Sequence, residues 1–448
     1  MGCDLRKEIC IFVKLEKQEV VLGVVSKIKY GIKQNQREVK DIFYLIVLQG
    51  LTYVIPLLVL PYLMKVLGAE KFGYIGFATS ISTYLMILVD FGFNLSATKK
   101  ISIARDNKEE LSKIFTVTVL AKTLLLLISA FVLFLIGLIP AYHIYRETMW
   151  IMFLVVVSNA YLFVFLFQGM GYIKWVTIIN SISKLSILPL TFWIVKSPED
   201  YLKAALIQSM VYVFSTLLSW AVLYYKKWVT FVRVSWNNIK DALKHSLPLF
   251  MSTAATSVYV ACYVVILGYF VSPEQVGQYS AVEKIMRALC YLLLTPILQV
   301  MYPYIGRLGT TDRKKSLSIF RYAMVAVFIF MSAATLFMLL VPTYFVKYIG
   351  ESYAGSEMVF YIMAFAPIFI GLGGVMGQLG LLALGDEKEK QQFRNVYLVA
   401  TIVSIISILL LPRWYGIIGG SISLLLTELL VCLGMFFYGR KFLYSSKS

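Results

Sequence analysis

The chain has 448 residues, of which 59% are hydrophobic and 15% are charged, and its mean hydropathy is +0.78. A soluble domain has about 45–50% apolar and about 25% charged residues, so the composition excludes an ordinary soluble globular protein and indicates a membrane protein. The net charge of +18 would favour nucleic acid in a soluble chain. No basic cluster is interleaved with stacking aromatic residues, and no nucleic acid partner is expected.

Residues 1–40 form a cytoplasmic extension that lacks a long apolar run, and no cleavable signal peptide is expected there. Apolar residues within 20–28 share one face of a helix, which is typical of a helix lying on an anionic membrane surface. A mobile extension is the alternative. The five cysteines are scattered and predict neither a disulfide framework nor a metal site.

The rest of the chain reads as an all-α integral membrane protein, because apolar runs of about 20 residues, the length that spans a bilayer as a helix, follow one another with short connections. Twelve spans are expected, at 42–64, 74–95, 114–138, 148–169, 175–195, 204–225, 247–270, 279–303, 317–341, 358–384, 395–411 and 414–438.

Alternate connections differ in basic residues. With the N-terminus inside, 30 of the 42 lysines and arginines lie on the cytoplasmic side and 7 on the outer side. Lysine and arginine accumulate in cytoplasmic loops, so both termini are predicted to be cytoplasmic.

The two halves of the span pattern resemble each other. The segment VLGAEKFGYIGFA (66–78) corresponds to ILGYFVSPEQVGQYSAV (266–282), with Gly73 matching Gly277 after a short insertion. Six spans per repeat place both halves the same way up. We expect two six-helix lobes, 41–225 and 247–438, around a central cavity, a basic cytoplasmic linker at 226–246 and a cytoplasmic tail at 439–448.

Residues 66–115, VLGAEKFGYIGFATSISTYLMILVDFGFNLSATKKISIARDNKEELSKIF, resemble the polysaccharide flippase family of the multidrug/oligosaccharidyl-lipid/polysaccharide exporter superfamily. The similarity rests on a Leu-Gly pair, a Phe/Tyr-Gly pair that is Phe72-Gly73 here, a glycine near the end of the second span and a basic residue before the next helix. Family members usually carry arginine at that basic position, where this chain has Lys99 and Lys100.

The resemblance implies a flippase that moves a polyprenyl-pyrophosphate-linked oligosaccharide from the cytoplasmic to the outer leaflet of a bacterial inner membrane, by alternating access of two lobes. The cargo would be a repeat unit of O-antigen or capsule. Partners would be this lipid, the bilayer and the polysaccharide polymerase machinery.

Basic residues inside predicted spans are candidate substrate ligands. An ionisable side chain within a span normally faces a cavity or a charged partner. Lys122 and Lys184 have no acidic residue within one helical turn, and Lys284 and Arg287 lie together on span eight. These four residues predict a cationic cavity for the pyrophosphate, since lysine and arginine both bind phosphate.

Acidic residues inside predicted spans are candidates for a gate or for ion coupling. Glu283 lies four residues before Arg287, a spacing that also allows a simple ion pair on one helix, and Glu428 lies near the middle of span twelve. A proton or sodium ion is the expected coupling ion if transport is driven, and passive flipping stays open.

Asp90 lies near the cytoplasmic end of span two, and we expect a gate role or a structural role at the helix end. Lys99 and Lys100 are its candidate partners. A single carboxylate without neighbouring oxygen ligands is too little for a metal site.

The chain has no Gly-x-x-x-x-Gly-Lys-Ser/Thr phosphate loop, so neither ATP use nor another cofactor is expected. A cation-coupled multidrug antiporter of the same superfamily is the alternative within transport. A membrane polysaccharide polymerase is less favoured, because the longest outer connection, 342–357, is short. A purely structural scaffold leaves the buried cations unexplained, so an enzyme is not expected and a flippase is favoured.

Overall fold

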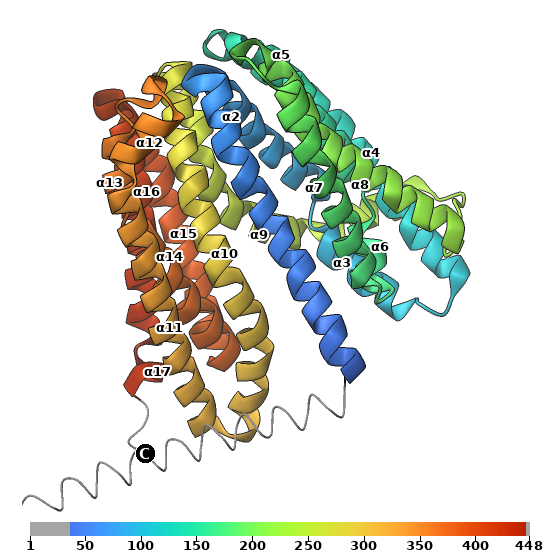
Figure 1. Ribbon diagram of the computed structural model, residues 1–448. Helices are drawn as coiled ribbons and strands as arrows, with labels where there is room; N and C mark the ends of the chain where they lie inside the picture. The colour runs from blue at the N-terminus through green and yellow to red at the C-terminus, as the bar shows by residue number, and fades with distance from the viewer. Residues whose placement is uncertain (1–35, 445–448) are drawn as a thin grey trace, which may run out of the picture. The chain divides into compact units, whose positions relative to one another are not determined.

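The structure is a computed structural model that describes residues 36–444, and these residues are almost entirely helical (Figure 1). The chain divides into two units, residues 1–51 and 52–448. Of the first unit, residues 36–51 are described and are helical. The surface helix expected over 20–28 lies outside the described residues.

The first half of the chain comprises α2 (Gln36–Asp90), α3 (Phe93–Ile103), α4 (Lys108–Gly137), η1 (Pro140–Tyr145), α5 (Arg146–Ala160), α6 (Val164–Gly169), α7 (Ile173–Ile194), η2 (Pro198–Asp200) and α8 (Tyr201–Lys226). The second half comprises α9 (Trp236–Phe270), α10 (Pro273–Thr311), α11 (Arg313–Leu340), α12 (Pro342–Ile349), η3 (Glu351–Tyr353), α13 (Glu357–Met363), α14 (Ala366–Val375), η4 (Met376–Leu384), α15 (Glu387–Leu410), α16 (Pro412–Gly439) and α17 (Lys441–Tyr444).

Ten segments among the described residues are long and apolar enough to cross a membrane. The predicted span 42–64 falls on α2, and 74–95 begins on the same helix beyond Gly68, whose φ of 67° and ψ of 173° interrupt it. The last residues of 74–95 take in the turn at Phe91 and Gly92 and the start of α3. The predicted span 247–270 falls on α9, which is not among the ten. The all-helical membrane architecture is confirmed, whereas the number twelve stays a prediction.

The linker expected at 226–246 is helical over its second half, because α9 begins at Trp236. Ile239 and Ala242 of this part are buried in one core cluster with Phe93 and Phe115. Hydropathy marks only the stretch that crosses the bilayer, and here tertiary packing extends the helix beyond it.

The helices of residues 52–448 pack in two groups (Figure 1). In the first group α8 packs on α5 and α7, and α4 packs on α5. In the second group α10 packs on α11, α14 on α11 and α16, and α15 on α16. Helix α9 contacts α3 and α4 as well as α15 and α16, so it joins the two groups. The lobe boundaries given above stay predictions.

The two halves come into close backbone contact where α2 and α10 cross. A Cβ atom built on Gly73 would lie 2.9 Å from the backbone nitrogen of Gly277, and one built on Gly277 would lie 3.0 Å from the nitrogen of Gly73. The same reciprocity holds one turn away, because those Cβ atoms would also meet the carbonyl oxygens of Pro273 and Ala69, respectively. We call this contact the glycine seam.

The glycine seam joins residues that the internal repeat had matched. The same sequence offset separates 69 from 273 and 73 from 277, and it also links Gly76 to Ser280, which lie in contact. A two-fold axis brings equivalent residues of two similar units into such self-complementary contact. Gly73 and Gly277, which the sequence comparison of the two halves matched, therefore meet in space, a contact that the sequence had not predicted.

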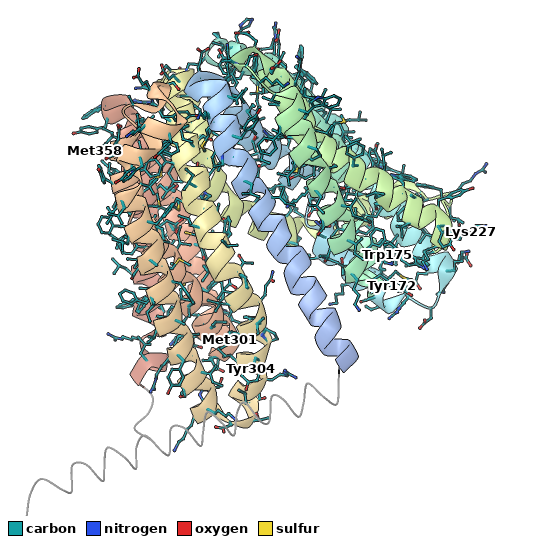
Figure 2. The ribbon with its side chains drawn as sticks, viewed as in Figure 1. Tyr172, Trp175, Lys227, Met301, Tyr304 and Met358 are labelled. Carbon is teal, nitrogen blue, oxygen red and sulfur yellow. The ribbon has the colours of Figure 1, made fainter. Side chains whose placement is uncertain are left out.

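Aromatic and basic side chains gather at one end of the first group, where Figure 2 shows Tyr172, Trp175 and Lys227 near one another. Tyr172 stacks on Trp228 with ring centroids 4.8 Å apart. Tyrosine and tryptophan are enriched at membrane–water interfaces. This is the end of α7 and α8 that the charge distribution predicts to face the cytoplasm.

Candidate cargo-binding cavities

One cavity of about 310 Å³ has two lysines in its wall. Lys184 reaches it from α7 and Lys284 from α10, and hydroxyl groups come from Thr79 and Thr83 of α2. We call it the lysine cavity. Sequence reasoning had selected both lysines but could not place them together, because they lie on helices of different halves of the chain.

The lysine cavity suits an anionic group. Both lysine side chains are half-buried, and the Lys284 ammonium lies 4.8 Å from the ring centroid of Phe72. A partly desolvated ammonium attracts anions more strongly than one in water, because the local dielectric is lower. The Thr79 and Thr83 hydroxyl groups donate to the carbonyl oxygens of Ile75 and Thr79, so the lysine ammonium groups are the donors that a phosphate oxygen would accept from.

A second cavity, of about 500 Å³, lies among α10, α14, η4, α15 and α16. Arg287 and Glu428 contribute charged groups to its wall, and Gln299 and Gln378 contribute amides. We call it the C-terminal cavity. Glu428 is only 6% exposed, so a carboxylate predicted near the middle of a span is indeed buried and faces a cavity.

Arg287 is paired within its own helix. Its Nε donates to Glu283 Oε1 at 2.8 Å, and the two side chains are 16% and 9% exposed. The alternative in which these residues simply pair across one turn is thereby confirmed. A guanidinium has further donors, and Arg287 keeps its place in the wall of the C-terminal cavity.

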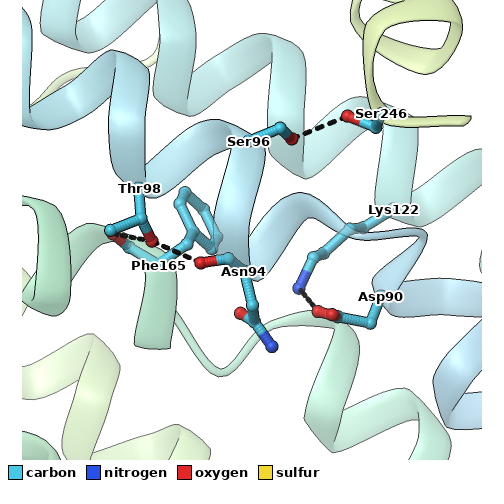
Figure 3. A network of polar contacts seen from close by, with 7 residues as sticks. All are labelled: Asp90, Asn94, Ser96, Thr98, Lys122, Phe165 and Ser246. Atoms are coloured by element: carbon cyan, nitrogen blue, oxygen red, sulfur yellow. Dashed lines mark hydrogen bonds and ion pairs between the residues drawn. The ribbon is translucent and has the colours of Figure 1, made fainter. Parts of the chain in front are cut away.

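Lys122 lies at a third position, outside both cavities (Figure 3). Its Nζ donates to Asp90 Oδ1 at 3.0 Å, and the side chains are 1% and 20% exposed. The expectation that Asp90 pairs with Lys99 or Lys100 is wrong, because both lysines are exposed and α4 brings Lys122 to the carboxylate instead. Lys122 therefore has an acidic partner that lies far from it in sequence.

The local backbone places Asp90 beside α4. The chain leaves α2 through Phe91 and Gly92, with φ of 45° and 75°, which turns it sharply before α3. A Cβ atom on Gly92 would lie 2.8 Å from the Cβ of Leu249, so glycine allows α9 to approach here. A phenylalanine with positive φ costs about 1–3 kcal/mol and is held by its surroundings.

Side chains of α3, of the turn before α3 and of α9 make further contacts in this region. Ser96 and Ser246 share a hydrogen bond of 2.7 Å between their Oγ atoms (Figure 3). Phe91 stacks on Phe250 with ring centroids 4.5 Å apart. We call these two contacts the α3–α9 contact.

Sequence reasoning missed Gln299 and Gln378. A glutamine inside an apolar run was the available signal, since it indicates a cavity or an interhelical hydrogen bond. Among the described residues, no group of three or more histidine, cysteine or acidic side chains is arranged to hold a metal ion.

Comparison with solved structures defines the class of fold. The lipid II flippase MurJ in an inward closed conformation superposes with a TM-score of 0.70 at 13% identity, covering 88% of this chain and 87% of that chain. An inward-facing multidrug resistance MATE family transporter of the MOP superfamily gives a TM-score of 0.68 at 14% identity, covering 89% and 96%. The chain thus has the two-lobe helical fold of these membrane proteins.

Sequence comparison defines the family. Residues 39–309 match the family described as polysaccharide biosynthesis protein, and the chain belongs to it. A protein of Escherichia coli (strain K12) named "Putative O-antigen transporter" is 32% identical over 403 residues, which cover 90% of this chain and 96% of that protein. A protein of Shigella dysenteriae with the same name is 31% identical over 404 residues, covering 88% and 98%. The resemblance read from residues 66–115 is confirmed.

Proposed function

We propose that the protein is a flippase that moves a polyprenyl-pyrophosphate-linked oligosaccharide from the cytoplasmic to the outer leaflet. The observation that carries the proposal is the lysine cavity, where Lys184 and Lys284 from opposite halves of the chain face one space. The family and the names of the two relatives support the same cargo class.

The chemistry divides the cargo into three parts. The pyrophosphate is anionic and fits the lysine cavity, where two ammonium groups replace part of its hydration. The polyprenyl tail is apolar and stays in lipid. Alternating access of the two lobes would carry the head group across, and the chain would act as a transporter without breaking a covalent bond.

The setting of this activity is proposed as well. The protein would lie in the inner membrane of a bacterium with both termini in the cytoplasm, as the distribution of basic residues favours. The polysaccharide polymerase machinery would then receive the flipped repeat unit at the outer surface.

Reconstitution into liposomes tests the proposal. A fluorescent polyprenyl-pyrophosphate saccharide is placed in one leaflet and its arrival in the other is timed. Wild-type protein is expected to accelerate flipping, and the double variant Lys184→Ala/Lys284→Ala is expected to slow it at least tenfold, because each charge-assisted hydrogen bond is worth about 1.5–3 kcal/mol.

Lys388→Ala is the matched control, because Lys388 is exposed at the start of α15 and outside both cavities. Normal flipping by the double variant would remove the lysine cavity from the mechanism. No flipping by wild-type protein, together with export of a small organic cation, would replace the flippase with the multidrug antiporter.

Glu428 is the proposed coupling group. Glu428 is a buried carboxylate in the wall of the C-terminal cavity. Arg287 lines the same cavity, but its guanidinium is already paired with Glu283. Binding and release of a proton or a sodium ion at Glu428 would link flipping to an ion gradient. A proton or sodium gradient should accelerate flipping by wild-type protein and leave Glu428→Gln unaffected, whereas equal rates with and without gradients would indicate passive flipping.

A further inference from the structure

The C-terminal cavity contains polar groups that cannot face lipid. Gln299 of α10 and Gln378 of η4 are both exposed, although each lies in a segment that is long and apolar enough to cross a membrane. An amide exposed to hydrocarbon has no hydrogen-bond partner and is strongly disfavoured. Both side chains line the C-terminal cavity, so this space is built to hold water or a polar ligand.

The helix that carries Gln378 in the wall of the C-terminal cavity is irregular. Residues Met376–Leu384 form a π-helix, a conformation that is rare and found frequently at functional sites. Gly374, two residues before the π-helix, also lines the cavity, and a Cβ atom there would lie 3.3 Å from Leu294. Glycine at this position therefore allows α10 to approach closely, and the π-helix carries Gln378 in the cavity wall.

The lining differs from that of the lysine cavity in charge. The Arg287 guanidinium is neutralised by Glu283, and Glu428 adds a second carboxylate. An anionic pyrophosphate is therefore better placed in the lysine cavity than here. A neutral ligand that both donates and accepts hydrogen bonds suits two amides, a guanidinium and a carboxylate.

Aromatic residues in the wall of the C-terminal cavity add surfaces that a sugar ring can stack on. Tyr291, Tyr302 and Tyr397 line the same cavity, and tyrosine combines an apolar ring with a polar hydroxyl. A sugar ring has apolar C–H faces and a rim of hydroxyl groups, so it matches tyrosine rings and amides at once. The volume of about 500 Å³ lies within the range of about 300–1,000 Å³ that small-ligand pockets occupy.

We propose that the C-terminal cavity binds the saccharide part of the cargo, beyond the sugar nearest to the pyrophosphate. This inference rests on the proposed function and adds a second site to it. The lysine cavity takes the charged group, and the C-terminal cavity selects cargo by its outer sugars.

A pair of cargoes that differ only in sugar length tests this. One probe is polyprenyl pyrophosphate carrying a single N-acetylglucosamine, and the other carries a trisaccharide extended from the same sugar. Gln299→Ala and Gln378→Ala, made separately, are expected to slow flipping of the trisaccharide lipid about fivefold to tenfold and that of the single-sugar lipid by less than twofold. Gln391→Ala, exposed at the start of α15, is the matched control.

Each result decides the matter. Equal slowing of both probes, or no slowing of either, would overturn the saccharide site while leaving the flippase in place. If wild-type protein moves neither probe, the proposed function fails, and calorimetric titration of the purified protein with the free trisaccharide still tests the site. Binding that Gln378→Ala weakens would support it, and absence of binding would overturn it. Tyr302→Phe, which keeps the ring, gives the same test with little risk to folding.

Discussion

Two ion pairs of the described helices, Asp90–Lys122 and Glu283–Arg287, differ in what they connect. Asp90 and Lys122 join the end of α2 to α4, and the lysine is 1% exposed. Glu283 and Arg287 lie one turn apart on α10 beside the C-terminal cavity. The first pair fixes the position of two helices relative to each other. The second orients the Arg287 guanidinium in the wall of the C-terminal cavity, where a ligand could bind.

This difference predicts different consequences when a pair is broken. Removing one partner from a buried pair leaves an uncompensated charge that the interior cannot solvate. Loss of Asp90 would leave the Lys122 ammonium as such an uncompensated charge, because the Lys122 side chain is almost fully buried. Arg287 borders the C-terminal cavity, where water can replace part of a lost interaction, whereas Glu283 is buried.

The largest effect is expected for Asp90→Asn. It leaves the Lys122 ammonium buried without its counter-charge and should destabilise the protein by about 3–5 kcal/mol. Lys122→Met should cost less, because Asp90 is partly exposed and keeps contact with water. Thermal unfolding in detergent measures both.

The double variant Asp90→Asn/Lys122→Met tests whether the two charges act as a pair. It removes both charges and should recover much of the stability that Asp90→Asn loses. Asp106→Asn, on an exposed aspartate between α3 and α4, is the control for the carboxyl-to-amide change. A double variant no more stable than Asp90→Asn would show that the pair does not act as a unit.

A smaller effect on stability is expected for Arg287→Gln. It leaves Glu283 without its hydrogen-bonded cation, and the loss should be about 1.5–3 kcal/mol, the value of a hydrogen bond to a charged group. Slower flipping should accompany it, which distinguishes this pair from Asp90–Lys122. A variant that unfolds earlier but flips at the normal rate would assign Arg287 a structural role only.

The smallest effect is expected at the α3–α9 contact. Ser246→Ala removes the partner of the Ser96 hydroxyl and should cost about 1 kcal/mol. Ser186→Ala serves as the comparison, because the Ser186 hydroxyl donates only to the Ser183 carbonyl of its own helix. A loss at Ser246 as large as that for Asp90→Asn would place the main link between α3 and α9 here.

The sequence predicted the Glu283–Arg287 pair because helical spacing alone brings these residues together. It could not predict Asp90–Lys122, since that pair depends on how α2 ends and where α4 packs. Lys99 and Lys100 were closer along the chain, but the turn at Phe91 and Gly92 directs them to solvent. Sequence distance was a poor guide to spatial distance where the backbone reverses.

The composition of the two cavities was also only partly predictable from the sequence. The apolar runs predicted the helices, and the rule that buried charges face cavities selected Lys184, Lys284 and Glu428. Which residues share a cavity depends on packing between helices of different halves, which periodicity does not encode. The π-helix that carries Gln378 has no sequence signature of its own, so the glutamine could be noticed in an apolar run but not assigned to this cavity from the sequence.

The glycine seam has a consequence for how such chains evolve. Gly73 and Gly277 each occupy the space that a side chain on the other would need, and no residue is smaller than glycine. A substitution at one position therefore has no compensating change at the other. Across relatives that keep this crossing, the two positions should stay fixed rather than vary together, so a search for correlated substitutions would not detect this contact between the two halves.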